Sequence, residues 1–291
     1  VKNKEYMFKN IDVTDGGNTL YMLGAAKDRS TKKFIYEVAH ITSGGEKVEQ
    51  FENEQPYEES LKLFRRNGKL VCAGFYREPK ADWYNGVSYF EIEPGSLKLQ
   101  KIKHHPFKQE WIDDKERNFF FSPESQRALI FRKIDVASNG DVIINAEEFY
   151  FVSSQNTTIP VLGDIISTRI DDAGELVWAS NIKKSQAIDN NAAFISYTYA
   201  LKNDVVTYFI NTSENAKKLK SGAVMFRGTG KNRSDFTIVT VDSKGEMDYV
   251  KLLDDNVNEV PFMTANGVVI DDHILFLGRR GSKKQLLKVQ L

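Results

Sequence analysis

Apolar and polar residues alternate in short runs along this chain, and each run ends in a turn rich in glycine, asparagine or aspartate. The run FKNIDV at Phe8–Val13 leads through Thr14–Gly17 into the apolar run Leu20–Gly24. A matching run, FRKIDV at Phe131–Val136, leads through its own glycine turn into Val142–Ala146. Alternation with a period of two, interrupted by turn residues, is typical of antiparallel β-hairpins. The pattern therefore predicts pairs of β-strands.

The paired-strand pattern recurs further along the chain, and a second turn signature follows the first four copies. The further copies begin at Leu61, Tyr197 and Val268. In the second signature a β-branched residue ends a strand and the chain turns through a glycine, as at Ile41–Glu46, Ile92–Ser96, Ile170–Glu175 and Val241–Glu246. Glycine is favoured there because such turns need a positive φ, which a Cβ atom penalises. Once two inserted segments, 103–127 and 214–234, are set aside, the repeating unit is about 50 residues long, the length of a four-stranded propeller blade.

We predict one all-β domain over residues 1–291, a β-propeller of four-stranded antiparallel blades. Five blades are predicted, at about residues 8–52, 60–102, 128–184, 195–254 and 262–291. The fifth copy stops after its third strand. Either residues 2–7 supply the missing outer strand, because an open ring leaves an unpaired edge, or further blades precede the chain. The aromatic residues within the alternating runs are expected in the core, namely Tyr21, Phe90, Trp178 and Tyr208.

One segment of the third blade resembles a known propeller repeat. Gly163–Trp178, GDIISTRIDDAGELVW, is similar to a repeat of bacterial secreted and envelope proteins that ends in Asp-x-x-Gly-x-Leu-hydrophobic-Trp. Asn139–Val142 and Phe149–Phe151 also resemble uncharacterised propeller proteins of Bacteroidetes. The resemblance implies the fold and an exported protein, located in the periplasm, at the outer membrane or on the cell surface. It supplies no catalytic residues.

Charge and composition narrow the range of functions. The chain carries 40 Lys and Arg against 40 Asp and Glu, so its formal net charge is zero. A balanced chain lacks the general attraction of basic proteins to nucleic acid or anionic membranes. The single cysteine, Cys72, excludes an intramolecular disulfide, and the chain has no apolar run of about 18 residues to span a bilayer. Because the chain starts at Val1, we expect a processed or truncated N-terminus, and a signal peptide or lipid anchor before it stays open.

Aromatic residues gather among charged ones in the first insertion, 103–127, and are the main candidates for binding a partner. The candidates are Phe107, Trp111, Phe119, Phe120 and Phe121 in this insertion, Tyr76, Trp83 and Tyr84 on a loop of the second blade, and the basic residues Lys217, Lys218, Lys220 and Arg227 in the second insertion. Such aromatic side chains are buried either by packing across the propeller face or against another protein. The basic loop is either solvated or a contact for an acidic partner.

Candidate catalytic residues are limited to carboxylates, which glycosidases use in converging pairs. Asp12 and Asp135 hold equivalent positions in blades one and three, whereas Asp82 and Asp164 lie on loops between second and third strands. An aspartate repeated at one blade position favours a structural role in turns, because catalysis would break the symmetry of the repeat. The pair His104–His105 lacks the spacing of zinc ligands, so we predict neither a metal site nor a cofactor.

The predicted function is a non-catalytic protein-binding or scaffold module of the bacterial cell envelope. It is expected to bind another envelope protein through loops and insertions on one face of the propeller, and nucleic acid is not among the expected partners. The alternative is a glycan-binding protein or a glycoside hydrolase that uses carboxylates at the propeller mouth. Hydrolysis needs two carboxylates within about 5–10 Å of each other, whereas docking needs an exposed apolar surface.

Overall fold

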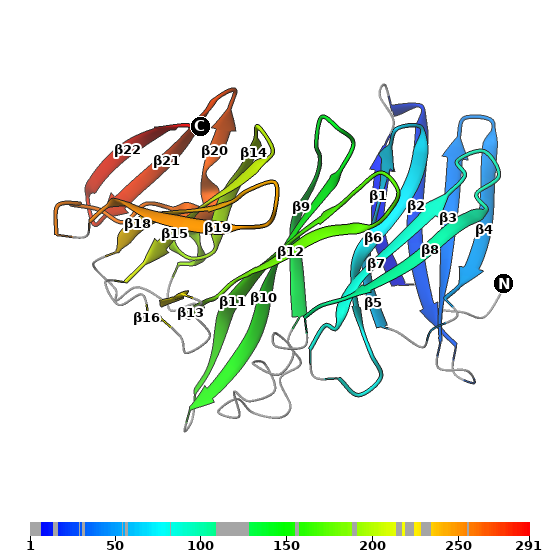
Figure 1. Cartoon of the computed structure of the whole chain (residues 1–291), viewed down its shortest axis with the longest axis horizontal. Coiled ribbons are helices and arrows are strands. Elements are labelled where there is room, and N and C mark those ends of the chain that lie inside the picture. Colours follow the sequence, from blue (N-terminus) through cyan, green and yellow to red (C-terminus); the bar gives the residue numbers. More distant parts are fainter. Residues whose placement is uncertain are drawn as a thin grey trace. The chain divides into compact units, whose positions relative to one another are not determined.

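Strands dominate the computed structural model of the chain (Figure 1). The structure describes residues 7–13, 17–28, 30, 33–53, 55, 58–81, 83–108, 128–154, 157–187, 191–213, 217–218, 224–227, 234–254 and 256–291. Contacts within the chain divide it into two compact units. Unit 1 comprises Val1–Asn118 with Asp171–Leu176, and unit 2 comprises Phe119–Ile170 with Val177–Leu291.

Unit 1 contains two antiparallel sheets, and the strands of each follow one another in chain order. The first sheet consists of β1 (Met7–Val13), β2 (Thr19–Lys27), β3 (Phe34–Thr42) and β4 (Gly45–Glu52). The second consists of β5 (Glu58–Arg66), β6 (Lys69–Arg77), β7 (Gly86–Ile92) and β8 (Leu99–Pro106). The two sheets share one apolar cluster, in which Leu23, Tyr36, Leu70 and Phe90 are fully buried. The single cysteine, Cys72, is also fully buried there.

Unit 2 contains the other three sheets. The third is built on β9 (Ala128–Val136), β10 (Val142–Ser154), β11 (Thr157–Ile170) and β12 (Leu176–Ile182). The fourth consists of β14 (Tyr197–Lys202), β15 (Val205–Thr212), β18 (Asp235–Val241) and β19 (Met247–Leu253). The fifth consists of β20 (Val268–Ile270), β21 (His273–Arg280) and β22 (Lys283–Gln290).

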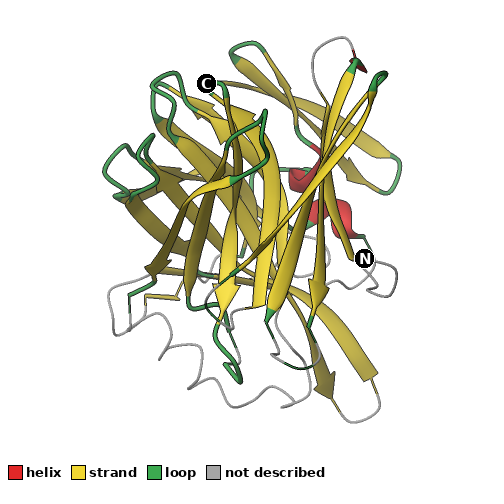
Figure 2. Cartoon of the chain, turned by 90° about the vertical axis from the view of Figure 1, so that its right-hand side faces the viewer, coloured by secondary structure: helices red, strands yellow, loops and turns green. Residues whose placement is uncertain are grey.

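Three short strands extend the third sheet of unit 2. β13 (Lys184–Ala187) pairs with β11 on one side and, in parallel, with β17 (Val224–Arg227) on the other. β17 in turn pairs with β16 (Lys217–Lys218). The segment predicted as an insertion, 214–234, therefore contributes strands to a sheet. Helical turns are short, since η2 (Ala192–Phe194) and η3 (Thr264–Asn266) span three residues each (Figure 2).

Turn residues at the sheet ends explain the repeated glycines of the sequence. Asn67 and Gly68, which join β5 to β6, have φ values of 46° and 76°. This pair of left-handed residues matches the twist of a two-residue hairpin. Gly245 has a φ of 82°, and a Cβ atom there would lie 2.7 Å from the Cβ of Trp178. Only glycine meets both demands at this position.

The predicted fold class is confirmed. The chain is all-β: three of its five described sheets consist of four antiparallel strands, the third is extended to seven strands and the fifth has three, a series consistent with propeller blades. The aromatic residues expected in the core are buried, since Tyr21, Phe90, Trp178 and Tyr208 are at most 7% exposed. Among the described residues, no helix is long and apolar enough to cross a membrane.

Candidate functional site

Two β-bulges in the third sheet redirect polar side chains into the interior of unit 2. In the first bulge, Asn145 of β10 pairs with Lys133 of β9, and Ala146 pairs with Phe131. Arg132 is therefore the extra residue on β9. On β11, the residues Gly163 and Asp164 together lie opposite Glu148 alone. A bulge locally changes the direction in which a side chain points, which is why bulges often lie next to functional sites.

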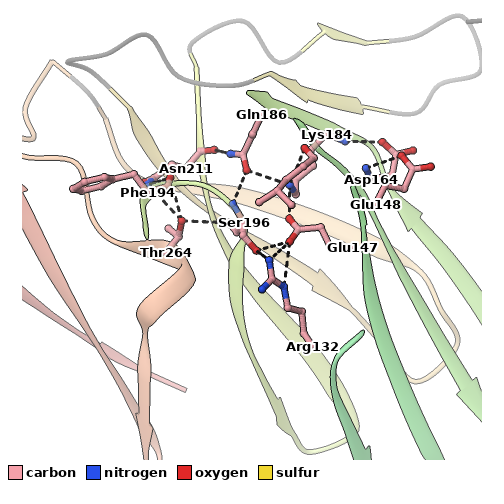
Figure 3. A network of polar contacts seen from close by, with 11 residues as sticks. Arg132, Glu147, Glu148, Asp164, Lys184, Gln186, Phe194, Ser196, Asn211 and Thr264 are labelled. Atoms are coloured by element: carbon pink, nitrogen blue, oxygen red, sulfur yellow. Dashed lines mark hydrogen bonds and ion pairs between the residues drawn. The ribbon is translucent and has the colours of Figure 1, made fainter. Parts of the chain in front are cut away.

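Glu147 is the centre of a charged network at these bulges (Figure 3). Its side chain is fully buried, and Arg132 Nη2 lies 2.6 Å from its Oε2 atom. Lys184 Nζ, also fully buried, lies 2.6 Å from Oε1, and the Ser196 hydroxyl donates a hydrogen bond of 2.5 Å to Oε2. A buried carboxylate needs such compensation, because its desolvation costs several kcal/mol. The Arg132 side chain is 36% exposed, so the network reaches solvent there.

Lys184 brings two further carboxylates into the network. Its backbone N–H donates to Asp164 Oδ1 at 3.0 Å, and the backbone N–H of Asp164 donates to Glu148 Oε2 at 3.1 Å. The Lys184 ammonium also donates to the carbonyl of Leu162 at 3.3 Å. The short strand β13 is thus tied to the bulge of β11 through both the backbone and the side chain of one lysine. Glu148 and Asp164 are 1% and 6% exposed.

Gln186 links the charged group to the fourth and fifth sheets of unit 2. Its side-chain oxygen accepts from Lys184 Nζ at 3.1 Å and from the Ser196 N–H at 2.9 Å, while its amide donates to the carbonyl of Asn211 at 2.7 Å. The hydroxyl of Thr264 donates to the Ser196 carbonyl at 3.2 Å. Ser196 has a φ of 73°, a strained conformation for a residue other than glycine, which the surrounding bonds hold in place.

The charged network holds the strands that it joins in a fixed position. Both oxygens of Glu147 are already engaged by a cation or a hydroxyl, and Glu148 and Asp164 each accept from a backbone amide. Buried ion pairs and hydrogen bonds of this kind restrict the arrangement of the elements that they join. The network therefore fastens β13 and the base of β10 and β11 to the rest of unit 2.

Beyond these bulges, β10 and β11 form a long hairpin that extends past the end of β9, towards the bottom of Figure 1. The pairing of β10 with β9 ends at Phe149, whereas its pairing with β11 continues to Ser154. We call residues 149–162 the hairpin arm. On one face of the arm the rings of Phe149 and Phe151 meet edge to face, with centroids 5.1 Å apart, and Phe151 lies opposite Pro160. Phe151 is 43% exposed.

The aromatic candidates of the sequence that the structure describes lie inside unit 1. Tyr76, Trp83, Tyr84 and Phe107 are at most 9% exposed. The ring of Phe107 lies 5.7 Å from that of Trp83, so these side chains pack on one another in the interior rather than forming an exposed docking surface. The candidates Trp111, Phe119, Phe120, Phe121 and Lys220 lie outside the described residues. Lys217, Lys218 and Arg227 are placed by their backbones in β16 and β17, and their side chains lie outside the description.

The four candidate carboxylates have separate surroundings. Asp12 accepts from Arg65 Nε at 2.6 Å in unit 1. In unit 2, Asp135 contacts the Lys133 ammonium and accepts from the Tyr199 hydroxyl. Asp164 lies within strand β11 rather than on the predicted loop, and it belongs to the charged network. Asp82 lies outside the described residues. The sequence prediction missed Glu147 and Glu148, for which the only signal was an acidic pair within an otherwise apolar strand.

The adjacent histidines of unit 1 contact neighbouring polar groups. His104 Nδ1 lies 3.0 Å from the Ser88 hydroxyl, and its Nε2 lies 3.3 Å from Asn53 Oδ1. Burial and the neighbouring His105 lower the pKa of His104. Ser88 is fully buried. The described residues contain no group of three or more His, Cys, Asp or Glu arranged to hold a metal ion.

Comparison with known proteins does not identify a family. No protein-family model and no curated protein matches the chain. Among solved structures, an acylaminoacyl peptidase of Pyrococcus horikoshii is similar over 98% of this chain and 38% of its own length, at 10% identity and a TM-score of 0.45. A GH43_1 enzyme of Xanthomonas citri in complex with xylose is similar over 100% of this chain and 88% of its own, at 10% identity and a TM-score of 0.39.

An endo-arabinase of Bacteroides thetaiotaomicron is also similar, over 100% of this chain and 95% of its own, at 7% identity and a TM-score of 0.31. The chain thus spans well under half of the peptidase but nearly the full length of the two other enzymes. Similarity at this level assigns no role to any residue of this chain.

Proposed function

We propose that the chain is a non-catalytic binding module of the bacterial cell envelope and that the hairpin arm is its contact surface for another protein. The observation that carries the proposal is the aromatic face of the arm, where Phe151 is 43% exposed beside Phe149 and opposite Pro160. Aromatic side chains contribute most of the binding energy in many interfaces, and rigid strands present them at a low entropic cost.

The charged network supports this proposal because it holds the base of the arm. Glu147 and Asp164 lie on β10 and β11 next to the arm in sequence, and both are bound by Lys184 of β13. Leu162, the last residue of the arm, accepts a hydrogen bond from the same lysine. A surface supported in this way loses little conformational freedom on binding. The envelope location rests on the resemblance of Gly163–Trp178 to exported repeat proteins.

Site-specific photo-crosslinking tests the contact surface. A benzophenone analogue of phenylalanine is placed at Phe151 in one variant and at Val250 in another, since Val250 is also an exposed strand residue of unit 2, at 56%. The expected result in native cells is one cross-linked protein of defined mass from position 151 and none from position 250. The absence of a product at position 151, or the same products from both positions, contradicts the proposal.

The affinity for the identified partner then measures the contribution of the ring. Phe151→Ser is expected to weaken binding by about 2 kcal/mol, as truncation of a central aromatic contact does. Phe8→Ser, at a phenylalanine of unit 1 that is 61% exposed, is the control and leaves the affinity unchanged. Equal effects of both substitutions would show that the arm is not the contact surface.

Glycan binding or hydrolysis is the second candidate. The specific observation in its favour is the group of acidic residues at the bulge, where Glu148 and Asp164 are joined through the Asp164 N–H. Two of the similar solved structures are sugar-active enzymes by name, a GH43_1 enzyme and an endo-arabinase. Incubation with arabinan and xylan tests this candidate. Release of reducing sugar that is lost in both Glu148→Gln and Asp164→Asn would replace the first proposal by this one.

A further inference from the structure

The fifth sheet of unit 2 ends in an open edge. Its strands β20, β21 and β22 lie in that order, and in the described part of the chain β22 pairs with β21 alone. The first and fourth sheets carry an additional outer strand at the equivalent place, β4 and β19. An edge strand presents a row of unpaired N–H and C=O groups to which another strand can bind. β22 offers eight residues for such pairing.

A groove of about 430 Å³, lined by both apolar and polar residues, lies beside this edge. Its apolar lining consists of Leu253, Val257, Phe262, Leu286 and Leu287. Leu286 is 70% exposed and Val257 is 84% exposed, so both remain in water although they flank the groove. A side chain placed between them would remove this apolar surface from water, at a gain of about 25 cal/mol per Å².

The sheet face that carries Leu286 also carries positive charge. Lys284 lies directly opposite Arg279 on β21, and Leu286 lies opposite Leu277. Like charges at directly opposed positions of a sheet are destabilising. Among the described residues, Lys283 forms an ion pair, whereas Arg279, Lys284 and Lys288 form none. Lys284 and Lys288, two residues to either side of Leu286, are both exposed.

We propose that β22 accepts a fourth, antiparallel strand from a partner polypeptide with an acidic–apolar–acidic alternation. An apolar side chain of that strand lies opposite Leu286, and a carboxylate lies opposite each of Lys284 and Lys288. Strand addition derives its affinity from main-chain hydrogen bonds and its specificity from alternate side chains. The surface belongs to the fifth sheet, and the inference does not depend on the function proposed for the hairpin arm.

Charge also favours an acidic partner strand over two other strands that could pair with the edge of β22. Residues 2–7, the expected donor within the chain, carry Lys2 and Lys4 against the one acidic residue Glu5, so this segment is basic on balance and complements the lysines of β22 poorly. A second copy of β22 would bring Lys284 and Lys288 against the same residues, an arrangement by which edge strands avoid pairing with themselves. An acidic strand is the occupant that neutralises the face.

Binding of a designed peptide tests the proposal. A fluorescein-labelled peptide, Ser-Glu-Thr-Val-Thr-Glu-Ser, is titrated with the protein and its fluorescence anisotropy is followed. We expect saturable one-to-one binding, and a peptide with lysines in place of the glutamates should bind about tenfold more weakly. In the double variant Lys284→Glu with Lys288→Glu the preference should reverse. Lys98→Glu, at an exposed lysine of unit 1, is the control and should change neither affinity.

A second measurement uses the unaltered protein and therefore does not depend on the folding of a variant. The acidic peptide is N-methylated at alternate amides, either along the edge that faces β22 or along the opposite edge. Because N-methylation removes the donor, one of the two peptides should lose binding and the other should keep it. No saturable binding of the acidic peptide, equal binding of both charge patterns, or equal binding of both methylated peptides would overturn the proposal.

Discussion

Replacing Lys184 with methionine removes the ammonium group that lies 2.6 Å from Glu147 Oε1 while keeping most of the apolar stem. Both side chains are fully buried, so Glu147 would retain only Arg132 and the Ser196 hydroxyl as partners. Removal of one partner from a buried ion pair costs about 3–5 kcal/mol. Since Arg132 continues to compensate part of the charge, we expect the free energy of unfolding to fall by about 3 kcal/mol, the lower end of that range.

Urea unfolding followed by circular dichroism measures this loss. With a slope of about 3 kcal/mol per M, the midpoint should fall by about 1 M. Lys133→Met, at a lysine whose side chain is 66% exposed, is the matched control and should change the free energy of unfolding by less than about 0.5 kcal/mol. In the double variant Lys184→Met with Glu147→Leu, most of the loss should be recovered, because both fully buried charges are gone and Arg132, which loses its carboxylate, reaches solvent. A Lys184→Met protein as stable as the control would refute the stabilising role of the network.

Three further predictions follow from burial and close packing. Gly163→Ala places a Cβ atom 2.5 Å from a carboxylate oxygen of Glu148, so it should lower the melting temperature through a loss of about 1–3 kcal/mol, and an unchanged melting temperature would contradict the close approach. Burial lowers the pKa of His104, so the unfolded chain takes up its proton first as the pH falls. Stability should therefore decrease below a pH of about 6.5, the ordinary pKa of histidine, and His104→Gln should flatten that decrease in melting scans at pH 7.5 and 5.5. Phe236→Ala, at a fully buried ring, should cost about 3–5 kcal/mol in urea unfolding, and a smaller loss would mean that the fourth and fifth sheets repack around it.

The sheets were predictable because each depends on local signals. The alternation in Phe8–Val13 and Phe131–Val136 places both as first strands of their sheets, β1 and β9. The glycine turn at Val241–Glu246 lies between β18 and β19, where Gly245 has its positive φ. Strand propensity and turn chemistry are properties of neighbouring residues, so a sequence displays them directly.

The candidate site depended on long-range pairing that a sequence does not display. Arg132 enters the network because it is the extra residue of a bulge, and nothing in FRKIDV marks it as such. Lys184 reaches Glu147 because β13 turns back against β11, a contact between residues far apart in the chain. Asp164 was a candidate on chemical grounds, but its role depends on these same two features. The burial of individual side chains was equally hard to predict, since Trp83 was a candidate for binding a partner and is buried inside unit 1.

The single cysteine provides a chemical probe for the opening of unit 1. Cys72 is fully buried on β6 among the side chains shared by the first two sheets, so a thiol reagent can reach it only when those sheets come apart. The rate of labelling under native conditions then reports the free energy of the opening that exposes Cys72. Changes made in unit 2, such as those at Lys184, leave that rate unaltered if the two units open independently and slow or hasten it if they open together.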